Sequence, residues 1–505
     1  MLASPNALCE CWRMEMDAFG FEHTYRALPE QFHARVQPTP VAQPRLFALN
    51  EELARQLRLP VPALAANGAQ IFSGNRLPAD AQPIALAYAG HQFGGFVPQL
   101  GDGRALLMGE LLDCEGRRRD VQLKGAGPTP FSRRGDGRAA LGPVMREYLV
   151  SEAMHALGIP TTRALAAVST GESVIREEVL PGAVFTRVAS SHIRVGTFEY
   201  FAAQSDWPSV EQLARYAIDR HYPEVKFLDR PFLVFLESVA ERQAALVADW
   251  MRVGFIHGVM NTDNSSISGE TIDYGPCAFM DAYDPKAVFS AIDRSGRYAF
   301  SNQPYIAQWN LARLAEALLP LIDADLEKAV EAAREVIQNM LSRFERHWLA
   351  NMRAKIGLST ERPEDRALVG DLLDIMHRCG ADFTKTFRSL CDANQRFEVP
   401  HCAHNIPGLP AQYEAWVVRW KQRLAAETTT ELERSNLMRK FNPARIPRNH
   451  RIEEAIQAAV SSDDFGPFER LGAALREPYS ESEAYSEYEN APTEEQRVRR
   501  TFCGT

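Results

Sequence analysis

The chain has 505 residues, of which 45% are hydrophobic and 24% charged, a balance typical of globular proteins that excludes general disorder. Its 56 Lys and Arg residues face 65 Asp and Glu residues, and the net charge of −9 argues against a nucleic-acid-binding surface. The longest apolar runs are too short to cross a bilayer, so we expect no membrane partner either.

The N-terminal segment lacks the features of an export signal. Glu10, Glu15 and Asp17 stand where a signal peptide needs an apolar core and where transit peptides avoid acidic residues. The eight cysteines are irregularly spaced and do not predict a disulfide framework. We therefore expect a cytoplasmic protein.

The first part of the chain predicts a small sheet. Residues 1–84, rich in Pro and Ala with one helix expected around residues 50–57, are interpreted as a wrapping segment. A glycine-rich loop then leads into two strands, expected at residues 104–112 and 120–124. A helix beginning near Pro143 and ending near Gly158 follows. Two further strands are expected, at residues 163–168 and 172–188.

The rest of the chain is predicted to be largely helical. The expected helices are residues 232–254, 305–321, 323–354 and 363–379. Strands followed by helices indicate an α+β protein of two lobes. We assign an antiparallel β N-lobe to residues 85–200 and a helical C-lobe, with extra C-terminal helices, to residues 201–477. Residues 478–505, rich in Glu, are expected to be a mobile acidic tail.

Three features of the N-lobe together point to a nucleotide site. Gly101 and Gly103 would let backbone N–H groups approach a phosphate closely, and Arg104 adds a forked positive charge. Lys124 ends a predicted strand, and Glu147 lies on the next helix. In kinase folds such a glutamate holds a strand lysine on nucleotide phosphates. Each feature alone is more often a turn or a surface charge, so only the combination carries weight.

The segment HGVMNTDN, which begins at His257, and the later IDYGP resemble two kinase motifs. Protein kinases carry H-R-D-x-x-x-x-N and then D-F-G, whose Asn and second Asp hold magnesium. In this register Asn264 and Asp273 match the metal ligands. The kinase catalytic Asp falls on Val259, which cannot accept a proton. Ordinary γ-phosphoryl transfer is therefore disfavoured, and Asp263 offers a carboxylate beside Asn264 instead. The combination predicts a protein-kinase-like two-lobed fold.

At this point the chain resembles a known family, the SelO proteins, which are protein adenylyltransferases with a pseudokinase fold. The motifs that carry the resemblance are YAGHQFG, QLGDGRA, LKGAGPTPFSRRGDGRA, REYLVSEAM, FTRVASSHIRVGTFEY and HGVMNTDNSSISGETIDYGPCAFMD. The resemblance implies transfer of AMP from ATP to Ser, Thr or Tyr hydroxyls of other proteins, with ATP bound in reversed orientation compared with a kinase. It leaves open whether UMP is transferred instead.

The resemblance also implies roles for single residues. The positions that would contact the nucleotide are Gly101, Gly103, Arg104, Lys124, Asp136, Gly137, Arg187, Arg194 and Asp273. Glu147 would hold Lys124, and Arg187 with Arg194 would bind the phosphates of the reversed ATP. Asp263 would be the proton acceptor. Asn264 and Asp273 would bind Mg²⁺ or Mn²⁺.

Cys503 stands third from the end of the chain, where eukaryotic relatives carry selenocysteine. The resemblance implies a redox role, with Cys277 as one conceivable partner, while an ordinary tail cysteine is an equal alternative. A cysteine here, with no transit peptide, favours a bacterial source. A zinc site at His401, Cys402 and His404 is disfavoured because a fourth ligand of suitable spacing is missing.

Two other functions compete with AMP transfer. A small-molecule kinase of the aminoglycoside phosphotransferase type shares the His257-Gly258 start of the loop, but Val259 replaces the Asp that it needs. A non-catalytic pseudokinase scaffold would bind nucleotide without chemistry. Retention of Lys124 and of both metal ligands disfavours the scaffold, which has no need of them.

Overall fold

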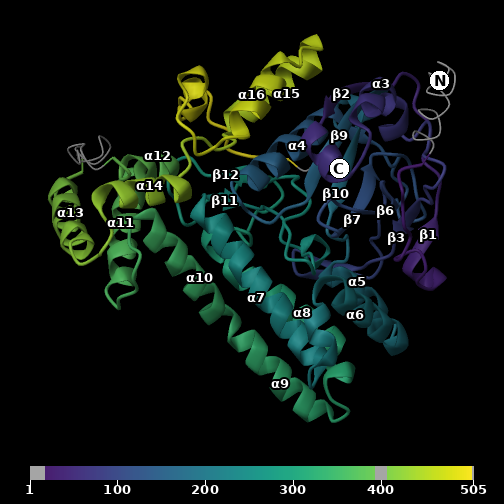
Figure 1. Cartoon of the computed structure of the whole chain (residues 1–505), viewed down its shortest axis with the longest axis horizontal. Coiled ribbons are helices and arrows are strands. Elements are labelled where there is room, and N and C mark those ends of the chain that lie inside the picture. The colour runs from purple at the N-terminus through teal and green to yellow at the C-terminus, as the bar shows by residue number, and fades with distance from the viewer. Residues whose placement is uncertain (1–17, 393–405, 503–505) are drawn as a thin grey trace, which may run out of the picture.

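The computed structural model describes residues 18–392 and 406–502. The strands of the large sheet gather at one end of the molecule, and the remainder is mostly helical (Figure 1). The protein is thus a mixed α/β protein with an antiparallel sheet and many helices, as the order of predicted elements indicated.

Eight strands of the described residues form one sheet in the order β1-β3-β6-β7-β10-β9-β2, with β8 beside β10. Every neighbouring pair is antiparallel. The strands of this sheet are β1 (His33–Arg35), β2 (Arg45–Leu49), β3 (Ile84–Leu86), β6 (Ala105–Leu112), β7 (Arg118–Lys124), β8 (Ala139–Ala140), β9 (Arg163–Ile175) and β10 (Val179–Ala189). Two small hairpin sheets are formed by β4 (Gly90–Gln92) with β5 (Gly95–Val97) and by β11 (Phe255–Ile256) with β12 (Ala278–Phe279).

Both faces of the sheet are covered, and seven of the eight residues of the central strand β6 are buried. Alternate side chains of β6 enter different cores: Leu107 joins the main core, while Leu106 and Met108 join a smaller cluster on the other face. The two strands predicted at residues 104–112 and 120–124 are β6 and β7.

The N-terminal segment contributes strands to the sheet in addition to wrapping it. β1 and β2 are the two ends of the strand order. The expected helix around residues 50–57 is α2 (Glu51–Gln56), capped by the side chain of Asn50. A second helix, α3 (Val61–Phe72), was not predicted, and its Leu64 and Phe72 are buried against the sheet.

The boundary between β9 and β10 differs from our prediction. We expected a break before Glu172, but β9 continues to Ile175 and the turn lies at residues 176–178. Gly171, with a φ of +71°, sits within β9, and the pairing register shifts between Pro181 and Ala183 opposite it. The glycine therefore marks an irregularity inside a strand, where sequence reasoning took it as a strand end.

The helices after the sheet build the larger part of the molecule. They are α4 (Leu141–Ala156), α5 (Val195–Ala202), α6 (Trp207–His221), α7 (Pro231–Arg252), α8 (Gln303–Ile322), α9 (Leu326–Gln338), α10 (Met340–Lys355), α11 (Asp365–Cys379), α12 (Phe383–Ser389), α13 (Leu409–Leu424), α14 (Glu431–Phe441), α15 (Asn449–Ser462) and α16 (Gly466–Leu475). Short 3₁₀ helices are η1 (Glu30–Phe32), η2 (Pro223–Phe227), η3 (Thr262–Asn264), η4 (Phe300–Asn302) and η6 (Glu483–Glu489). The single helix predicted over residues 323–354 is two helices, α9 and α10, separated at Asn339.

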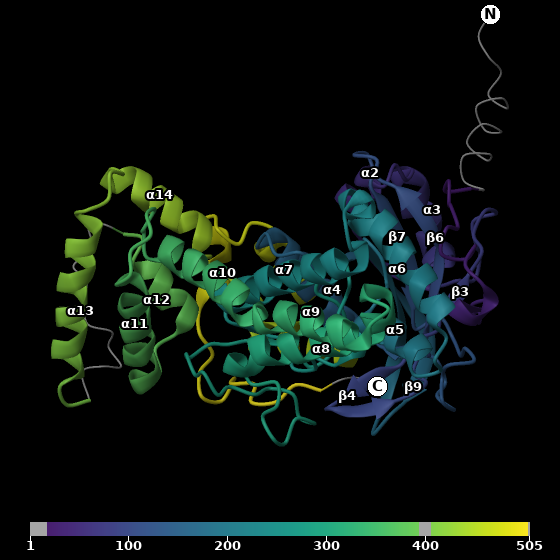
Figure 2. The same cartoon turned by 90° about the horizontal axis from the view of Figure 1, so that it is seen from below.

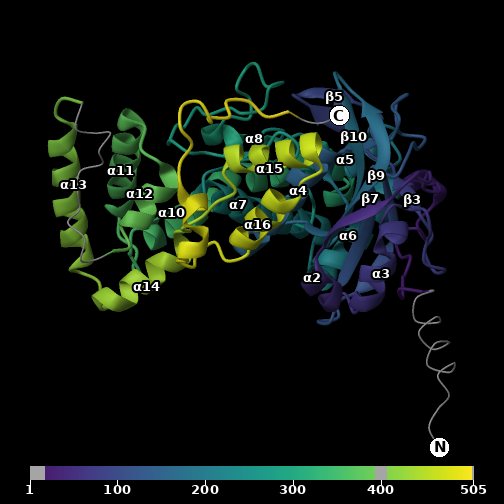
Figure 3. The same ribbon diagram turned by 90° about the horizontal axis from the view of Figure 1, so that it is seen from above.

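The helices form two groups around a central bundle. α7 packs against α8 and α10, and α11 to α14 lie beyond them at the end farthest from the sheet (Figure 2). α15 and α16 return to pack on α4, next to the sheet (Figure 3). Within the described residues, no helix is long and apolar enough to cross a membrane.

The acidic segment expected as a mobile tail packs against the helical part through buried arginines. Arg445 donates hydrogen bonds to the carbonyl oxygens of Glu477 and Ser480, at 2.8 and 2.9 Å. Arg448 donates to the carbonyl of Glu489 at 3.1 Å, and both arginines are 1% exposed. Composition suggested a solvated chain, but these interior guanidinium groups need acceptors, and the segment supplies them.

Candidate functional site

A cavity of about 720 Å³ lies between the sheet, α4 and the loops that follow α7. Twelve of the residues singled out in the sequence line it: Gly101, Gly103, Arg104, Lys124, Asp136, Gly137, Glu147, Arg187, Arg194, Asp263, Asn264 and Asp273. They come from positions 172 residues apart at the extremes, counting from 101 to 273. Its size is within the usual range for small-molecule sites, about 300–1,000 Å³.

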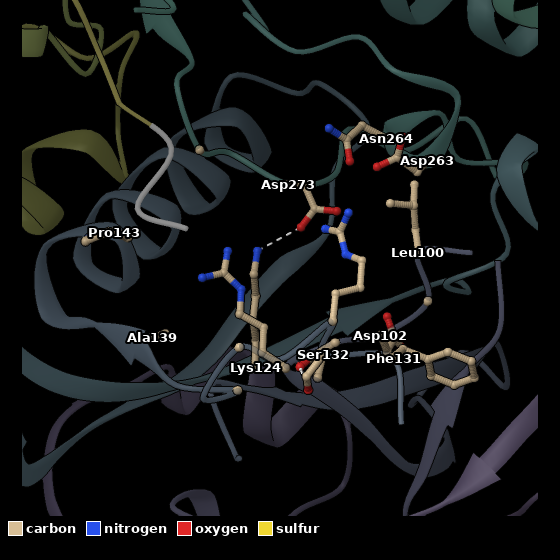
Figure 4. A pocket seen from close by; sticks show the side chains of 18 of the residues that line it. Leu100, Asp102, Lys124, Phe131, Ser132, Ala139, Pro143, Asp263, Asn264 and Asp273 are labelled. Atoms are coloured by element: carbon tan, nitrogen blue, oxygen red, sulfur yellow. Dashed lines mark hydrogen bonds and ion pairs between the residues drawn. The ribbon is translucent and has the colours of Figure 1, made fainter. Parts of the chain in front are cut away.

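Asp273 is the centre of the charged groups in this cavity. Its Oδ1 accepts hydrogen bonds from Lys124 Nζ and Arg187 Nη1, both at 2.7 Å, and its Oδ2 accepts one from Arg194 Nη1 at 2.6 Å. Figure 4 shows Lys124 reaching Asp273 from the sheet side. Burial raises the pKa of Asp273, but the three positive charges outweigh it and hold the pKa well below the usual range.

Glu147 on α4 completes this network. Its Oε2 accepts a hydrogen bond from Lys124 at 2.7 Å and its Oε1 accepts one from Arg187 at 3.2 Å. The strand lysine and the helix glutamate therefore pair, which is the geometry that the kinase comparison required. Lys124, Arg187 and Arg194 bring three positive charges against two carboxylates, so the cluster keeps a formal charge of +1.

Arg187 and Arg194 are interior residues, not the exposed strand arginines that the sequence also allowed. Arg187 is 1% exposed, and Gln122 Oε1 accepts hydrogen bonds from its Nε and Nη2 at 3.2 and 2.6 Å. Arg194 is 3% exposed and lies over the ring of Tyr88, with its Cζ 4.7 Å from the ring centroid. Such fixed guanidinium groups are suited to binding phosphate.

Asp263 lies on η3, next to Asn264 at the opposite side of the cavity from Lys124 (Figure 4). Its Oδ2 accepts a hydrogen bond from Gln92 Nε2 at 3.2 Å, whereas its buried Oδ1 has no partner among the described residues. Burial raises the pKa of Asp263 to about 6, although Arg194 opposes this shift. A carboxylate with a raised pKa at the wall of a cavity is suited to accept a proton.

The β4–β5 hairpin holds this part of the loop, and sequence reasoning assigned it no role. The backbone N–H of His91 donates to Thr262 Oγ1 at 2.6 Å, and that of Phe93 donates to Asn261 Oδ1 at 3.0 Å. Gln92, between them, reaches Asp263. The only signal was the motif YAGHQFG itself, because contacts between segments about 170 residues apart leave no local pattern.

His257 joins the two loops that carry the acidic residues. It is 1% exposed, and its Nε2 donates to the carbonyl oxygen of Ile272 at 2.9 Å, directly before Asp273. The tautomer follows from this bond, since only a protonated Nε2 can donate. Burial lowers the pKa of His257, which therefore stays neutral and acts as a structural link. Val259 lies two residues on and lines the cavity without a proton-accepting group.

The glycine loop differs from our expectation that its backbone N–H groups face a phosphate. The N–H groups of Gly101, Asp102 and Gly103 already donate to the carbonyl oxygens of Tyr88, Leu86 and Gly101, at 3.0, 2.9 and 2.9 Å. The glycines instead allow close packing, since a Cβ on Gly103 would lie 2.9 Å from the carbonyl oxygen of Phe131.

Asp136, Gly137 and Arg104 line the cavity from the second glycine-rich segment and from the start of β6. The Asp136 carboxylate is exposed and pairs with Arg176, at 2.8 and 3.1 Å, which lowers its pKa. Gly137 has a φ of +67° and packs against the backbone of Gly127, which leaves no space for a side chain. Arg176, which sequence reasoning did not single out, also lines the cavity and forms an ion pair with Asp136 there.

The oxygen ligands in the cavity suit a hard divalent cation. Asp273 and Asn264 offer carboxylate and amide oxygens, the ligands that Mg²⁺ and Mn²⁺ prefer. The Nδ2 of Asn264 donates to the carbonyl of Val259 at 3.0 Å, which orients its Oδ1 away from that loop. Among the described residues, no group of three or more His, Cys, Asp or Glu could hold a metal alone. Magnesium in nucleotide sites is usually bound by one or two carboxylates together with phosphate oxygens.

The C-terminal segment passes beside the cavity. Thr501 pairs with the backbone of Phe289 and Ala291, at 2.7 and 2.9 Å, and its hydroxyl donates to the carbonyl of Pro276, a residue of the cavity wall. Cys277 is buried, and its thiol contacts the carbonyl of Tyr274 at 3.6 Å. Cys503 lies outside the described residues, as do His401, Cys402 and His404.

Comparison with known proteins identifies the family. Residues 15–476 match the family described as Protein adenylyltransferase SelO. The chain belongs to this family. It is 60% identical over 489 residues to the Protein nucleotidyltransferase YdiU of Rhizobium etli (strain CIAT 652), covering 97% of this chain and 98% of that protein. The proteins of the same name in Rhizobium meliloti (strain 1021) and Bradyrhizobium sp. (strain ORS 278) are 57% and 58% identical, covering 97% and 96% of this chain and 100% and 99% of theirs.

Membership of the SelO family agrees with the resemblance seen in the motifs. The similarity spans both the sheet and the helices, including all twelve of the predicted residues that line the cavity. The chain is accordingly a transferase of the nucleotidyltransferase class. This classification disfavours both the small-molecule kinase and the non-catalytic scaffold.

Proposed function

We propose that this protein transfers AMP from ATP to hydroxyl groups of Ser, Thr or Tyr residues in other proteins. The observation that carries the proposal is the position of Asp263, a carboxylate that lines a cavity also containing three fixed cations. At the position of the kinase base stands Val259, so a proton acceptor is available only from the other part of the loop.

In the proposed reaction, the acceptor oxygen attacks the α-phosphorus of ATP. The bond between that phosphorus and the oxygen that bridges to the β-phosphate breaks. Pyrophosphate leaves, and the hydroxyl proton passes to the Asp263 carboxylate. We propose that Lys124, Arg187 and Arg194 bind the β- and γ-phosphates and stabilise the charge that develops there. This places ATP in the reversed orientation.

Asn264 and Asp273 are proposed to hold Mg²⁺ or Mn²⁺ together with phosphate oxygens. When bound, such an ion would neutralise phosphate charge. To coordinate it, Asp273 must exchange at least one of its hydrogen bonds from Lys124, Arg187 and Arg194, and the phosphates can accept these donors in turn.

We further propose a kinase-like two-lobed arrangement. The pairing of a sheet lysine with a helix glutamate, and the position of Asp273 between the paired strands β11 and β12, support this interpretation. The glycine loop would then support the nucleotide through its packed shape and through Arg104, since its backbone N–H groups have other acceptors.

Labelled ATP distinguishes the proposed reaction from phosphoryl transfer. The purified protein is incubated with a bacterial lysate, a divalent cation and ATP carrying the label on either the α- or the γ-phosphate. We expect label on acceptor proteins from α-labelled ATP only, and a mass increase of one AMP in tryptic peptides. Asp263→Asn should lose this labelling, whereas Asp371→Asn, on the exposed face of α11, should retain it. Labelling from γ-labelled ATP only would contradict the proposal.

A further inference from the structure

The tip of the β4–β5 hairpin has an unusual backbone conformation. Phe93 and Gly94 form its two-residue turn, with φ values of +52° and +87°. Turns with positive φ at both positions are normally occupied by Asn-Gly or similar pairs. A bulky aromatic residue rarely adopts this conformation, and residues held in such conformations concentrate at functional sites.

The surroundings of Phe93 keep it in this conformation. Its backbone N–H donates to Asn261 Oδ1, and the Tyr298 hydroxyl donates to the same oxygen at 2.6 Å. The rings of Phe93 and Tyr298 are 5.0 Å apart. The hairpin tip is therefore fixed to the loop that carries Asp263.

An exposed apolar surface results at the edge of the cavity. Phe93 and Ile292 are 36% and 56% exposed. Phe93 and Ile292 line the same cavity as Asp263, while the cations Lys124 and Arg187 line its other part. The phosphates of ATP require the cationic part of the cavity, so the apolar edge is not needed to bind the triphosphate.

We propose that this edge, made of Phe93 and Ile292, binds an apolar side chain of the acceptor polypeptide, next to the hydroxyl that is modified. The inference rests on the proposed function and specifies its substrate. The occupant is a polypeptide because the edge is continuous with the position of the proton acceptor, which an acceptor hydroxyl must reach. Exposed aromatic residues are also the side chains that most often anchor a protein partner.

Synthetic peptides test this preference directly. Each peptide carries one Ser, Thr or Tyr, with either Leu and Phe or Gly and Asp at the neighbouring positions. With α-labelled ATP, we expect the apolar set to be labelled with a kcat/KM about tenfold higher by the wild-type protein, the effect of burying one apolar side chain. Phe93→Asn should abolish this preference, because Asn tolerates the turn conformation but lacks the ring. Phe227→Asn, at a phenylalanine that is 87% exposed and outside the cavity, is the matched control and should retain it.

Thermal unfolding of each variant and the affinity for a non-hydrolysable ATP analogue separate the possible outcomes. A preference that is the same in wild type and Phe93→Asn overturns the inference and leaves the proposed function intact. If Phe93→Asn lowers the affinity for the ATP analogue by the same factor as it lowers the labelling of the apolar peptides, the ring contacts the nucleotide, and the inference is also overturned. A wild-type protein that labels neither peptide set nor any lysate protein overturns the proposed function together with the inference. If Phe93→Asn unfolds at a lower temperature than the wild type, Ile292→Asn replaces it. This variant changes the other residue of the edge, and its peptide preference is compared with that of the wild type in the same way.

Discussion

Lys124 Nζ donates hydrogen bonds to Asp273 and to Glu147, both at 2.7 Å, and so connects the sheet with a loop 149 residues later and with α4. One ammonium group thus donates hydrogen bonds to two carboxylates at the wall of the cavity. Because Arg187 contacts the same two carboxylates, the network does not depend on the lysine alone.

Replacing Lys124 by alanine should impair function more than folding. Glu147 and Asp273 keep their hydrogen bonds from Arg187, so the free energy of unfolding should fall by no more than about 2 kcal/mol. The rate of AMP transfer should fall about 10²- to 10³-fold, since a preorganised cation on the phosphates is lost. Lys226→Ala, at an exposed pair with Asp219, is the control for removal of a lysine and should keep full activity. Equal rates in the two variants would contradict the role of Lys124.

Replacing Asp273 by asparagine should affect both metal binding and stability. Three cations would lose their shared carboxylate in a buried place, which costs about 3–5 kcal/mol of unfolding free energy. Titration with Mn²⁺ in the presence of an ATP analogue should show binding to the wild type and at least about tenfold weaker binding to the variant. Chelation of divalent cations should stop AMP transfer by the wild type, and activity should return with added Mg²⁺ or Mn²⁺.

Two buried histidines should make folding stability depend on pH. Burial lowers the pKa of His192 to about 4 and that of His221 to about 3, below the usual 6.5. The unfolded chain therefore binds protons that the folded chain does not, and stability is full above pH 6.5 and decreases as the pH falls toward these values. At pH 4 each histidine should cost roughly 3 kcal/mol.

Urea unfolding at pH 8, 6 and 4.5 measures this dependence. His221→Asn should flatten the decrease in stability between pH 6.5 and 4.5, whereas His377→Asn, at an exposed position, should leave it unchanged. A decrease of the same slope in His221→Asn and the wild type would contradict the assignment.

Two glycine-to-alanine changes should affect different properties of the protein, one the rate of AMP transfer and the other the free energy of unfolding. A Cβ on Gly90 would lie 2.6 Å from Asp263 Oδ1, so Gly90→Ala should displace the proton acceptor and slow AMP transfer about 10- to 100-fold. Gly370, exposed on α11, has open space around its Cβ position. Gly370→Ala should raise the unfolding free energy by about 0.5–1 kcal/mol and leave activity unchanged. Activity assays with thermal unfolding test both; full activity in Gly90→Ala would show that Asp263 does not need its present position.

The sequence alone was sufficient to predict that the motif residues Lys124, Glu147 and Asp273 meet. The spacing from His257 to Asn264 and the order of Lys124, Glu147 and Asp273 follow a pattern that one fold imposes, so their presence in one cavity could be expected. The strands β6 and β7 and the helices α2 and α4 were also predictable, because turns, caps and apolar runs mark them locally.

Features that depend on packing between distant segments were not predictable. Gln92 meets Asp263 across 171 residues, and no local signal announces that contact. The N–H groups of the glycine loop could face a ligand or the protein's own carbonyls, and sequence does not distinguish these. The acidic C-terminal segment is ordered by Arg445 and Arg448, whose burial becomes apparent only in three dimensions.

The attachment of Thr501 beside the cavity has a practical consequence for handling the protein. Because a chain advances by at most about 3.6 Å per residue, a fusion partner joined a few residues after Thr501 would remain close to the wall formed by Pro276. A bulky domain there would compete for space with large acceptor proteins while leaving small peptides less affected. Purification tags intended for assays on whole proteins are therefore better removed from this end.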